Sequence, residues 1–124
     1  MKRVLVVDDG GTIRLYHRTV LTEAGFTVEE AVNGMEGLEK AMQGEFDLLL
    51  VDVNMPKMDG FRMIAQLRRE PAAWRVPVIM ITTEHRDVDR EQALIAGANL
   101  FLVKPVRPEE LRAAACLMTG MEGL

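Results

Sequence analysis

Five polar side chains that could do chemistry stand at the ends of short apolar runs in this sequence. They are Asp8, Asp9, Asp52, Thr82 and Lys104. Apolar runs of this length are typical of strands buried in a parallel sheet, and the carboxyl ends of parallel strands meet at one edge. In open α/β sheets, ligands bind at that edge. We therefore expect three carboxylates, one hydroxyl and one ammonium group to converge there.

The expected cluster carries more negative than positive charge. Two carboxylates about 4 Å apart repel each other by roughly 4 kcal/mol at an effective dielectric constant of about 20. The cluster therefore needs a cation, and oxygen ligands without nearby Cys or His favour Mg²⁺. With the metal bound, an ionised Asp52 could attack phosphorus while Lys104 and Thr82 neutralise the equatorial oxygens. The expected product is an aspartyl phosphate.

Alternating strand and helix patterns predict the elements that position these residues. The predicted strands cover 3–7, 26–31, 46–52, 76–82 and 100–103. The predicted helices cover 13–24, 34 to near 44, 61–67, roughly 87–96, and 108 to at least 117. Five such units imply an α/β fold with a single doubly wound, five-stranded parallel sheet and helices on both faces.

Length, composition and charge exclude several classes of protein. With 124 residues, of which 48% are hydrophobic, residues 1–124 are expected to form one domain with a real core and no output domain. A net charge of −4 argues against nucleic acid as the main partner, because phosphate neutralisation needs a clustered basic surface. No apolar run approaches the length of a membrane span. The single cysteine, Cys116, suits a reducing cytoplasm, where we expect the protein to act.

Five short motifs, in this order, resemble the receiver domain of two-component response regulators, most closely its single-domain CheY-like type. The motifs are Val-Val-Asp-Asp at 6–9, Asp52 with Met-Pro-Lys-Met-Asp-Gly at 55–60, Ile-Thr at 81–82, Gly-Ala at 97–98 and Lys-Pro at 104–105. Each motif alone is weak, but the ordered set is specific and covers the whole chain. The resemblance implies a flavodoxin-like sheet with the strand order 2-1-3-4-5.

The resemblance also implies roles for individual residues. Asp52 would be the phosphoacceptor, and Asp8 with Asp9 would be the acidic pair that holds Mg²⁺. Asp52 itself and the main-chain carbonyl of Asn54 would be further metal ligands. Lys104 would bind the phosphoryl oxygens.

Further residues would act in switching and in setting the lifetime of the phosphate. Thr82 would be the switch hydroxyl. Phe101 lies where the family has an aromatic residue whose rotamer reports phosphorylation, and here its ring lacks a hydroxyl. Asn54 and Glu84 match positions that tune how long the phosphate survives. By the same analogy, the Lys104–Pro105 peptide bond is expected to be cis, although only about 5% of X-Pro bonds in folded proteins are cis.

The resemblance implies signalling rather than metabolic catalysis. A histidine kinase or phosphotransfer protein would donate the phosphoryl group, and a downstream protein would bind the face made by the fourth helix, fifth strand and fifth helix. The protein would catalyse only its own phosphorylation and dephosphorylation. It is expected to be a monomer or a phosphorylation-dependent dimer, with a phosphate sink in a phosphorelay as the alternative role.

Two other classes of protein share this architecture and stay open. A phosphatase with an aspartate nucleophile, of the haloacid dehalogenase kind, also attacks from the end of a strand. Such an enzyme needs Asp-x-Asp, and Asn54 cannot act as the second carboxylic acid. A flavodoxin-like mononucleotide binder would need a phosphate cradle after the first strand, where Asp8 and Asp9 would repel a phosphate unless a cation intervened.

Two positions depart from the family pattern. Gly10 and Gly11 replace the more usual polar or bulky residues after the acidic pair. Two glycines make that loop harder to order, by about 1 kcal/mol each, so the affinity for metal could suffer. Thr83 occupies a position where the family often has a smaller residue, and it is expected to narrow access to Asp52.

Overall fold

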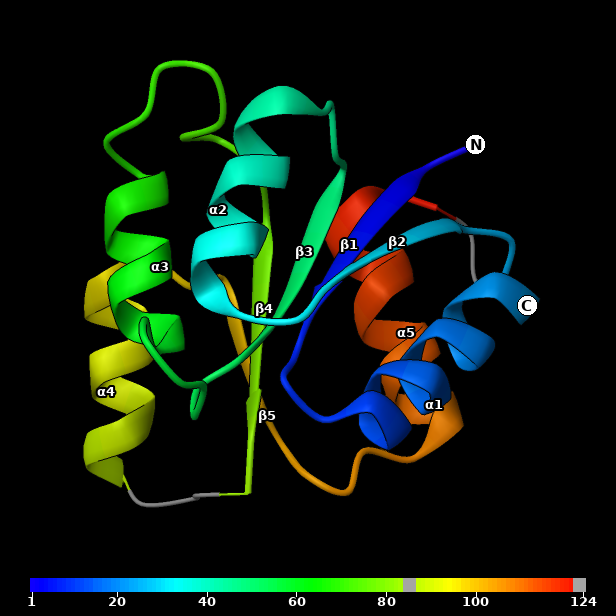
Figure 1. Ribbon diagram of the computed structural model, residues 1–124. Coiled ribbons are helices and arrows are strands. Elements are labelled where there is room, and N and C mark those ends of the chain that lie inside the picture. The colour runs from blue at the N-terminus through cyan, green and yellow to red at the C-terminus, as the bar shows by residue number, and fades with distance from the viewer. Residues whose placement is uncertain (84–86, 122–124) are drawn as a thin grey trace.

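The computed structural model describes residues 1–83 and 87–121. Within them, strands and helices alternate along the chain (Figure 1). The strands are β1 Arg3–Val7, β2 Thr27–Ala31, β3 Leu48–Asp52, β4 Val78–Thr82 and β5 Leu100–Val103. The helices are α1 Gly11–Glu23, α2 Gly34–Gln43, α3 Gly60–Leu67, α4 Asp87–Ala96 and α5 Pro108–Thr119.

The five strands form one sheet in the order β2-β1-β3-β4-β5, and each neighbouring pair is parallel. The register places Val7 beside Val51, Asp52 beside Ile81, and Thr82 beside Val103. The carboxyl ends of β1, β3, β4 and β5 therefore lie at the same edge of the sheet, toward the bottom of Figure 1. Both the predicted fold class and the strand order implied by the resemblance are confirmed.

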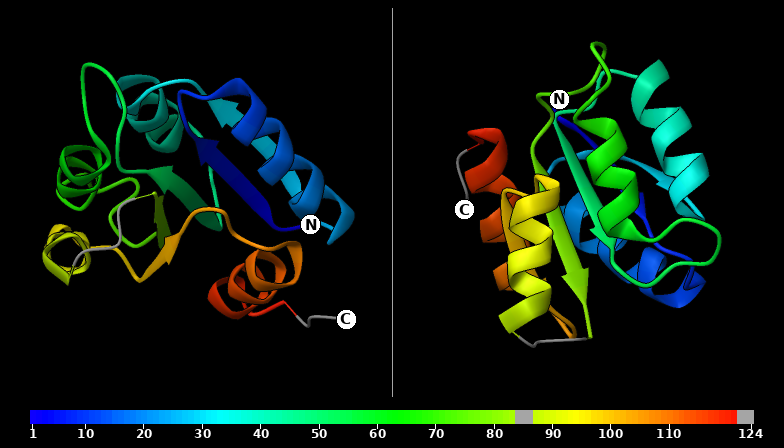
Figure 2. Two further views of the ribbon diagram at one scale, coloured as in Figure 1. Left: turned by 90° about the horizontal axis from the view of Figure 1, so that it is seen from below. Right: turned by 90° about the vertical axis from the view of Figure 1, so that its left-hand side faces the viewer.

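Helices cover both faces of the sheet, as Figure 2 shows end-on and from the side. One apolar core lies between the sheet and α2, α3 and α4, with Met63, Ile64 and Leu67 of α3 fully buried in it. The other lies between the sheet and α1 and α5, where Leu21 and Leu111 are fully buried. β1, β3 and β4 contribute side chains to both cores, which explains why their sequences are continuously apolar.

Local signals fix the starts of three helices. The Asn33 side chain accepts a hydrogen bond from the amide of Glu36 at the start of α2, and Asp59 does the same for Arg62 at the start of α3. Pro108 opens α5, where its missing N–H is no loss. None of the helices in the described part of the chain is long and apolar enough to cross a membrane.

Three predicted strands begin too early. β2, β3 and β4 start one or two residues after the predicted positions 26, 46 and 76. Pro77 has no amide to donate, so the ladder can begin only at Val78. The amide of Arg3 donates to the Asp47 carboxylate instead of a main-chain oxygen, and the pairing of β1 with β3 begins at Val4 and Leu48. Apolar residues alone did not reveal these breaks.

Candidate functional site

The predicted site residues lie at the carboxyl edge of the sheet. Asp8 and Asp9 follow β1 directly, Asp52 ends β3, Thr82 ends β4, and Lys104 follows β5. The turn after Asp52 depends on a glycine, because a Cβ atom on the first residue of α3 would meet the Asp52 carbonyl oxygen at 2.4 Å. The loop can therefore fold back against the end of β3 only with glycine at position 60.

The three aspartates form one acidic cluster. One carboxylate oxygen from each of Asp8, Asp9 and Asp52 lies within 4.8 Å of the others. The side chains of Asp8 and Asp52 are buried, with 3% and 6% of their surface exposed, whereas Asp9 is exposed. Three carboxylates with one side open to solvent suit Mg²⁺, which prefers oxygen ligands and keeps several waters. The donor set therefore fits a hard divalent cation.

Lys104 joins the two buried members of the cluster. Its Nζ atom donates to Oδ2 of Asp8 at 2.9 Å and to Oδ1 of Asp52 at 3.2 Å. The lysine is itself largely buried, so these charge-assisted bonds are less screened than those of a surface ion pair. The expected convergence of the carboxylates and the ammonium group is confirmed.

Burial and unequal charge shift the pKa values at this edge. Burial raises the pKa of Asp52 to about 6, the negative charge of Asp8 adds to the increase, and Lys104 partly offsets it. Burial alone would lower the pKa of Lys104, but its bonds and charge interactions with Asp8 and Asp52 outweigh burial and raise it. Burial also lowers the pKa of His17 on α1 to about 4, so this imidazole is neutral at pH 7 and adds no positive charge.

Thr82 and Asn54 lie on the side of the cluster nearer β4. Thr82 is fully buried, and the exposed Asn54 directs its side-chain amide toward the Thr82 hydroxyl with a long N···O distance of 3.4 Å. Glu84, the second residue expected to tune the lifetime of the phosphate, lies outside the described residues. Thr83 is exposed directly after β4.

The two remaining predicted features lie on β5 and just after it. Phe101 is 6% exposed, and the guanidinium carbon of Arg90 on α4 stands 5.6 Å from the centre of its ring. The Lys104–Pro105 peptide bond is cis, as the resemblance implied. The ring of Phe101 is thus buried.

The loop after the acidic pair has a backbone conformation that does not require its two glycines. Gly10 and Gly11 both have backbone angles that other residues can adopt, since neither has a positive φ. The amide of Gly10 donates to Oδ1 of Asp8 at 2.9 Å, whereas Lys104 contacts Oδ2 of the same carboxylate. Gly10 nevertheless caps α1 without any side-chain hydrogen bond.

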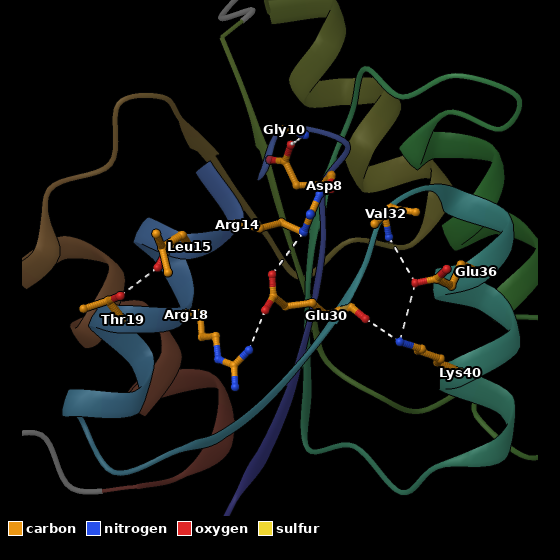
Figure 3. A network of polar contacts seen from close by, with 10 residues as sticks. All are labelled: Asp8, Gly10, Arg14, Leu15, Arg18, Thr19, Glu30, Val32, Glu36 and Lys40. Atoms are coloured by element: carbon orange, nitrogen blue, oxygen red, sulfur yellow. Dashed lines mark hydrogen bonds and ion pairs between the residues drawn. The ribbon is translucent and has the colours of Figure 1, made fainter. Parts of the chain in front are cut away.

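Sequence reasoning missed a network of ion pairs behind the acidic cluster, which Figure 3 shows. Arg14 on α1 donates to the main-chain oxygen of Asp8 at 2.7 Å and to Glu30 on β2 at 3.1 Å. Arg18 binds the other carboxylate oxygen of Glu30 at 2.6 Å. Glu30 is 16 residues from Arg14, so no helical spacing rule could have paired them.

Known proteins resemble this chain in sequence along most of its length. A family model described as the response regulator receiver domain matches residues 4–116. The gliding motility regulatory protein of Myxococcus xanthus is 39% identical over 113 residues, which cover 91% of this chain and 14% of that protein. The transcriptional regulatory protein ResD of Bacillus subtilis is 37% identical over 117 residues, covering 93% of this chain and 48% of ResD. The chain thus spans less than half the length of these two relatives.

Solved structures of similar size match the whole fold. The chemotaxis protein CheY4 of Vibrio cholerae superposes with a TM-score of 0.90 and 37% identity, covering 95% of this chain and 98% of CheY4. The receiver domain of the sensor histidine kinase PA1611 from Pseudomonas aeruginosa has a TM-score of 0.90 and 28% identity, with 96% and 98% covered, and was solved with magnesium in its active-site cleft. Taken with the arrangement of the three aspartates and the lysine, these matches lead to one conclusion. This chain belongs to the response regulator receiver domain family.

Proposed function

We propose that the chain accepts a phosphoryl group on Asp52 from the phosphohistidine of a kinase or phosphotransfer protein, and that this event changes a protein-binding face. The observation that carries the proposal is the contact of one lysine with two carboxylates, because Lys104 Nζ touches both Asp8 and Asp52. An ammonium group in that place can donate a hydrogen bond to the carboxylate before the transfer and to a phosphoryl oxygen after it.

The cation that the reaction needs would be held by the carboxylates of Asp8, Asp9 and Asp52 and by the main-chain carbonyl of Asn54. Bound there, Mg²⁺ supplies positive charge that lets an anionic donor approach an anionic acceptor. Asp8 is held on three sides, by Gly10, Lys104 and Arg14, the last through its main-chain oxygen. Such fixed ligands need little reorganisation when a cation binds.

In the transfer step, a carboxylate oxygen of Asp52 attacks phosphorus in line with the leaving imidazole nitrogen. The O–P bond forms as the N–P bond breaks, the electron pair stays on the nitrogen, and the imidazole then takes a proton from solvent. A pKa of about 6 leaves Asp52 mostly ionised at pH 7, as a nucleophile must be. Lys104 and the hydroxyl of Thr82 would donate hydrogen bonds to the phosphoryl oxygens.

The new charge would act as a switch through Thr82 and Phe101. The phosphorylated side chain would carry roughly 1.5 to 2 negative charges in place of the single charge of the carboxylate, which would draw Thr82 inward and let Phe101 repack against α4. Nearly complete switching needs about 5.5 kcal/mol of differential stabilisation, which a few charge-assisted bonds can supply. The face made by α4, β5 and α5 suits a protein partner, since Leu94 and Ile95 of α4 are 55% and 85% exposed.

Two other functions would need different residues at this edge of the sheet. A phosphatase of the haloacid dehalogenase kind would need an acid where Asn54 stands, and a nucleotide binder would place phosphate beside Asp8 and Asp9. Neither is favoured by this donor set. A phosphate sink would use the same chemistry on Asp52 but would bind no output partner.

The test is to incubate the protein with Mg²⁺ and acetyl phosphate and to follow its intact mass. We expect one added phosphoryl group, which does not form when a chelator is present from the start and does not form in Asp52→Asn. The matched control is Asp47→Asn, because Asp47 lies just before β3, at the end of the strand opposite the cluster, and its carboxylate bonds only the amide of Arg3 in the described contacts. A phosphoryl group that persists in Asp52→Asn would place the acceptor elsewhere, and rapid turnover of phosphate esters would revive the phosphatase.

A further inference from the structure

A single side-chain hydroxyl ties α1 to the loop that carries Lys104. The hydroxyl of Tyr16 donates to the main-chain oxygen of Val106 at 2.8 Å, across 90 residues of sequence. Val106 is buried and lies two residues after Lys104, between β5 and α5. A buried carbonyl oxygen needs a hydrogen-bond partner, so this bond has a structural reason to persist.

The other side of the same helix ties down the loop that carries Asp8. Arg14 donates to the main-chain oxygen of Asp8 and is itself held by Glu30 (Figure 3). Residues 14 and 16 point roughly 200° apart around a helix, because each residue turns it by about 100°. α1 therefore reaches two loops in opposite directions, one with a metal-ligand candidate and one with the lysine.

The two loops meet again at the acidic cluster, where Lys104 Nζ lies 2.9 Å from Asp8. The contacts thus close a ring that runs from Asp8 through Arg14, Tyr16 and Val106 to Lys104 and back to Asp8. The backbone amide of Lys104 is also fixed, since it donates to the Thr82 oxygen at 2.7 Å. Among the hydrogen bonds of the described residues, that of Tyr16 ties the chain just beyond Lys104 to α1, in addition to the apolar packing of Val106 against the same helix.

We propose that Tyr16 is a positioning residue for phosphoryl transfer, which acts by fixing the loop after Lys104 so that the ammonium group stays between Asp8 and Asp52. This inference rests on the proposed function, because it concerns the same transfer to Asp52. Lysine carries a flexible four-carbon stem, so its terminal position depends on where its backbone is held. A misplacement of about 1 Å in a reacting constellation can slow a reaction by up to about 100-fold.

The test uses Tyr16→Phe, which removes the hydroxyl and keeps the ring. With Mg²⁺ and acetyl phosphate, we expect the rate constant of Asp52 phosphorylation to fall by about 3- to 30-fold. The dissociation constant for Mg²⁺ should stay within about twofold, because Arg14 still holds the Asp8 loop. Circular dichroism and denaturant unfolding verify that the variant is folded under the assay conditions.

Thr19→Val is the matched control. Thr19 also lies on α1, and its hydroxyl also donates to a main-chain oxygen, that of Leu15 at 2.8 Å; within the described part of the chain, no hydrogen bond joins it to the site. Its rate should equal that of the unchanged protein. The decisive comparison repeats Tyr16→Phe in a Lys104→Ala background, where the hydroxyl should have no further effect on the rate if it acts through the lysine.

The outcomes separate this inference from the proposed function. Loss of rate in Tyr16→Phe, absent in Thr19→Val and in the Lys104→Ala background, supports it. An unchanged rate in Tyr16→Phe, or an equal loss with and without Lys104, overturns it. Should the unchanged protein not be phosphorylated on Asp52, the proposed function fails. The role of Tyr16 is then tested by hydrogen exchange of the Lys104 amide. This exchange must become faster in Tyr16→Phe if the bond from Tyr16 to Val106 positions the loop.

Discussion

Two clusters of charged side chains differ in how many cations face each carboxylate. In the acidic cluster, three aspartates lie together and one ammonium group, that of Lys104, pairs with two of them, Asp8 and Asp52. Around Glu30 on β2, one carboxylate is shared by the guanidinium groups of Arg14 and Arg18. The first cluster lies largely buried at the carboxyl edge of the sheet, and the second lies on the partly exposed β2 next to it.

The pKa values move in opposite directions. Burial and the charge of Asp8 raise the pKa of Asp52, whereas the hydrogen bond from Arg18 is the largest cause that lowers the pKa of Glu30. The Glu30 network is therefore stable as it stands. The acidic cluster is destabilised by its own negative charge. A bound cation or a neutral substitution that removes part of this charge should therefore stabilise the fold. Four experiments test this contrast.

The largest expected effect is a stabilisation by Asp52→Asn. Because the pKa of Asp52 rises from 3.8 to about 6 on folding, its ionised form destabilises the fold above about pH 6. The penalty disappears as the pH falls toward 4. In chelator at pH 7, we expect the free energy of unfolding to rise by about 1 to 3 kcal/mol, as measured by denaturant unfolding. A lower stability of Asp52→Asn at pH 7 would contradict the electrostatic reading, and the two proteins should converge near pH 4.

Mg²⁺ should stabilise the unchanged protein by a similar mechanism. A ligand at 100 times its dissociation constant adds about 2.7 kcal/mol to the free energy of unfolding. Titration with MgCl₂ should raise the melting temperature to a plateau, and Asp9→Asn should shift the titration to higher concentration. NaCl at matched ionic strength is the control. Equal stabilisation by NaCl would mean that screening, rather than binding at the three aspartates, relieves the repulsion.

Glu30→Gln should change the free energy of unfolding in the opposite direction, lowering it, and by a smaller amount. It removes ion pairs to Arg14 and Arg18, and partly exposed pairs contribute about 0.2 to 1 kcal/mol each. Because the pKa of Glu30 is lowered on folding, this stability is present above its ordinary value of 4.5 and is lost as the pH falls through the lowered value. Urea unfolding between pH 7 and pH 3 measures both trends.

The matched control for Glu30→Gln is Glu109→Gln, whose carboxylate faces Arg107 at 3.8 Å in an exposed position. It should change the free energy of unfolding little. The contrast between the two clusters would be wrong if Glu30→Gln stabilised the protein at pH 7.

The smallest effect concerns the loop after the acidic pair. A Cβ atom on Gly11 would meet only the flexible end of Arg14, at 3.7 Å, and its backbone angles are ordinary. Gly11→Ala should therefore raise the free energy of unfolding by about 0.4 to 1 kcal/mol, and a more ordered loop should bind Mg²⁺ more tightly. Gly60→Ala, which would strike the Asp52 oxygen, should instead lower stability. An unchanged Mg²⁺ affinity in a stabilised Gly11→Ala would show that loop order does not limit binding.

The sequence could predict the features that depend on short-range pattern. Polar residues at the ends of apolar runs identified four side chains that do converge, Asp8, Asp9, Asp52 and Lys104. The helix starts at Asn33 and Pro108 followed from capping preferences that depend on a few neighbouring residues. In both cases the sequence signal lies within one element and the turn beside it, and for the site the parallel sheet then brings the separate strand ends together.

Contacts between distant residues could not be predicted in this way. The bond from Tyr16 to Val106 joins a helix to a loop near the other end of the chain, and Tyr16 fits the apolar pattern of α1 like any core residue. The position of Arg90 over Phe101 depends on how α4 packs against β5. The errors at the starts of β3 and β4 have a local cause. The apolar character of a residue does not show whether its backbone is paired in the sheet.

The order of the strands in the sheet has a consequence for the newly made chain. The acceptor carboxylate arrives with residue 52, but the ammonium group that contacts it arrives only with residue 104, on the far side of β4. A nascent or truncated polypeptide that ends before β5 would contain Asp52 but would lack Lys104. Under the proposed function, phosphorylation of this aspartate would therefore require that the final strand has been synthesised and has docked in the sheet.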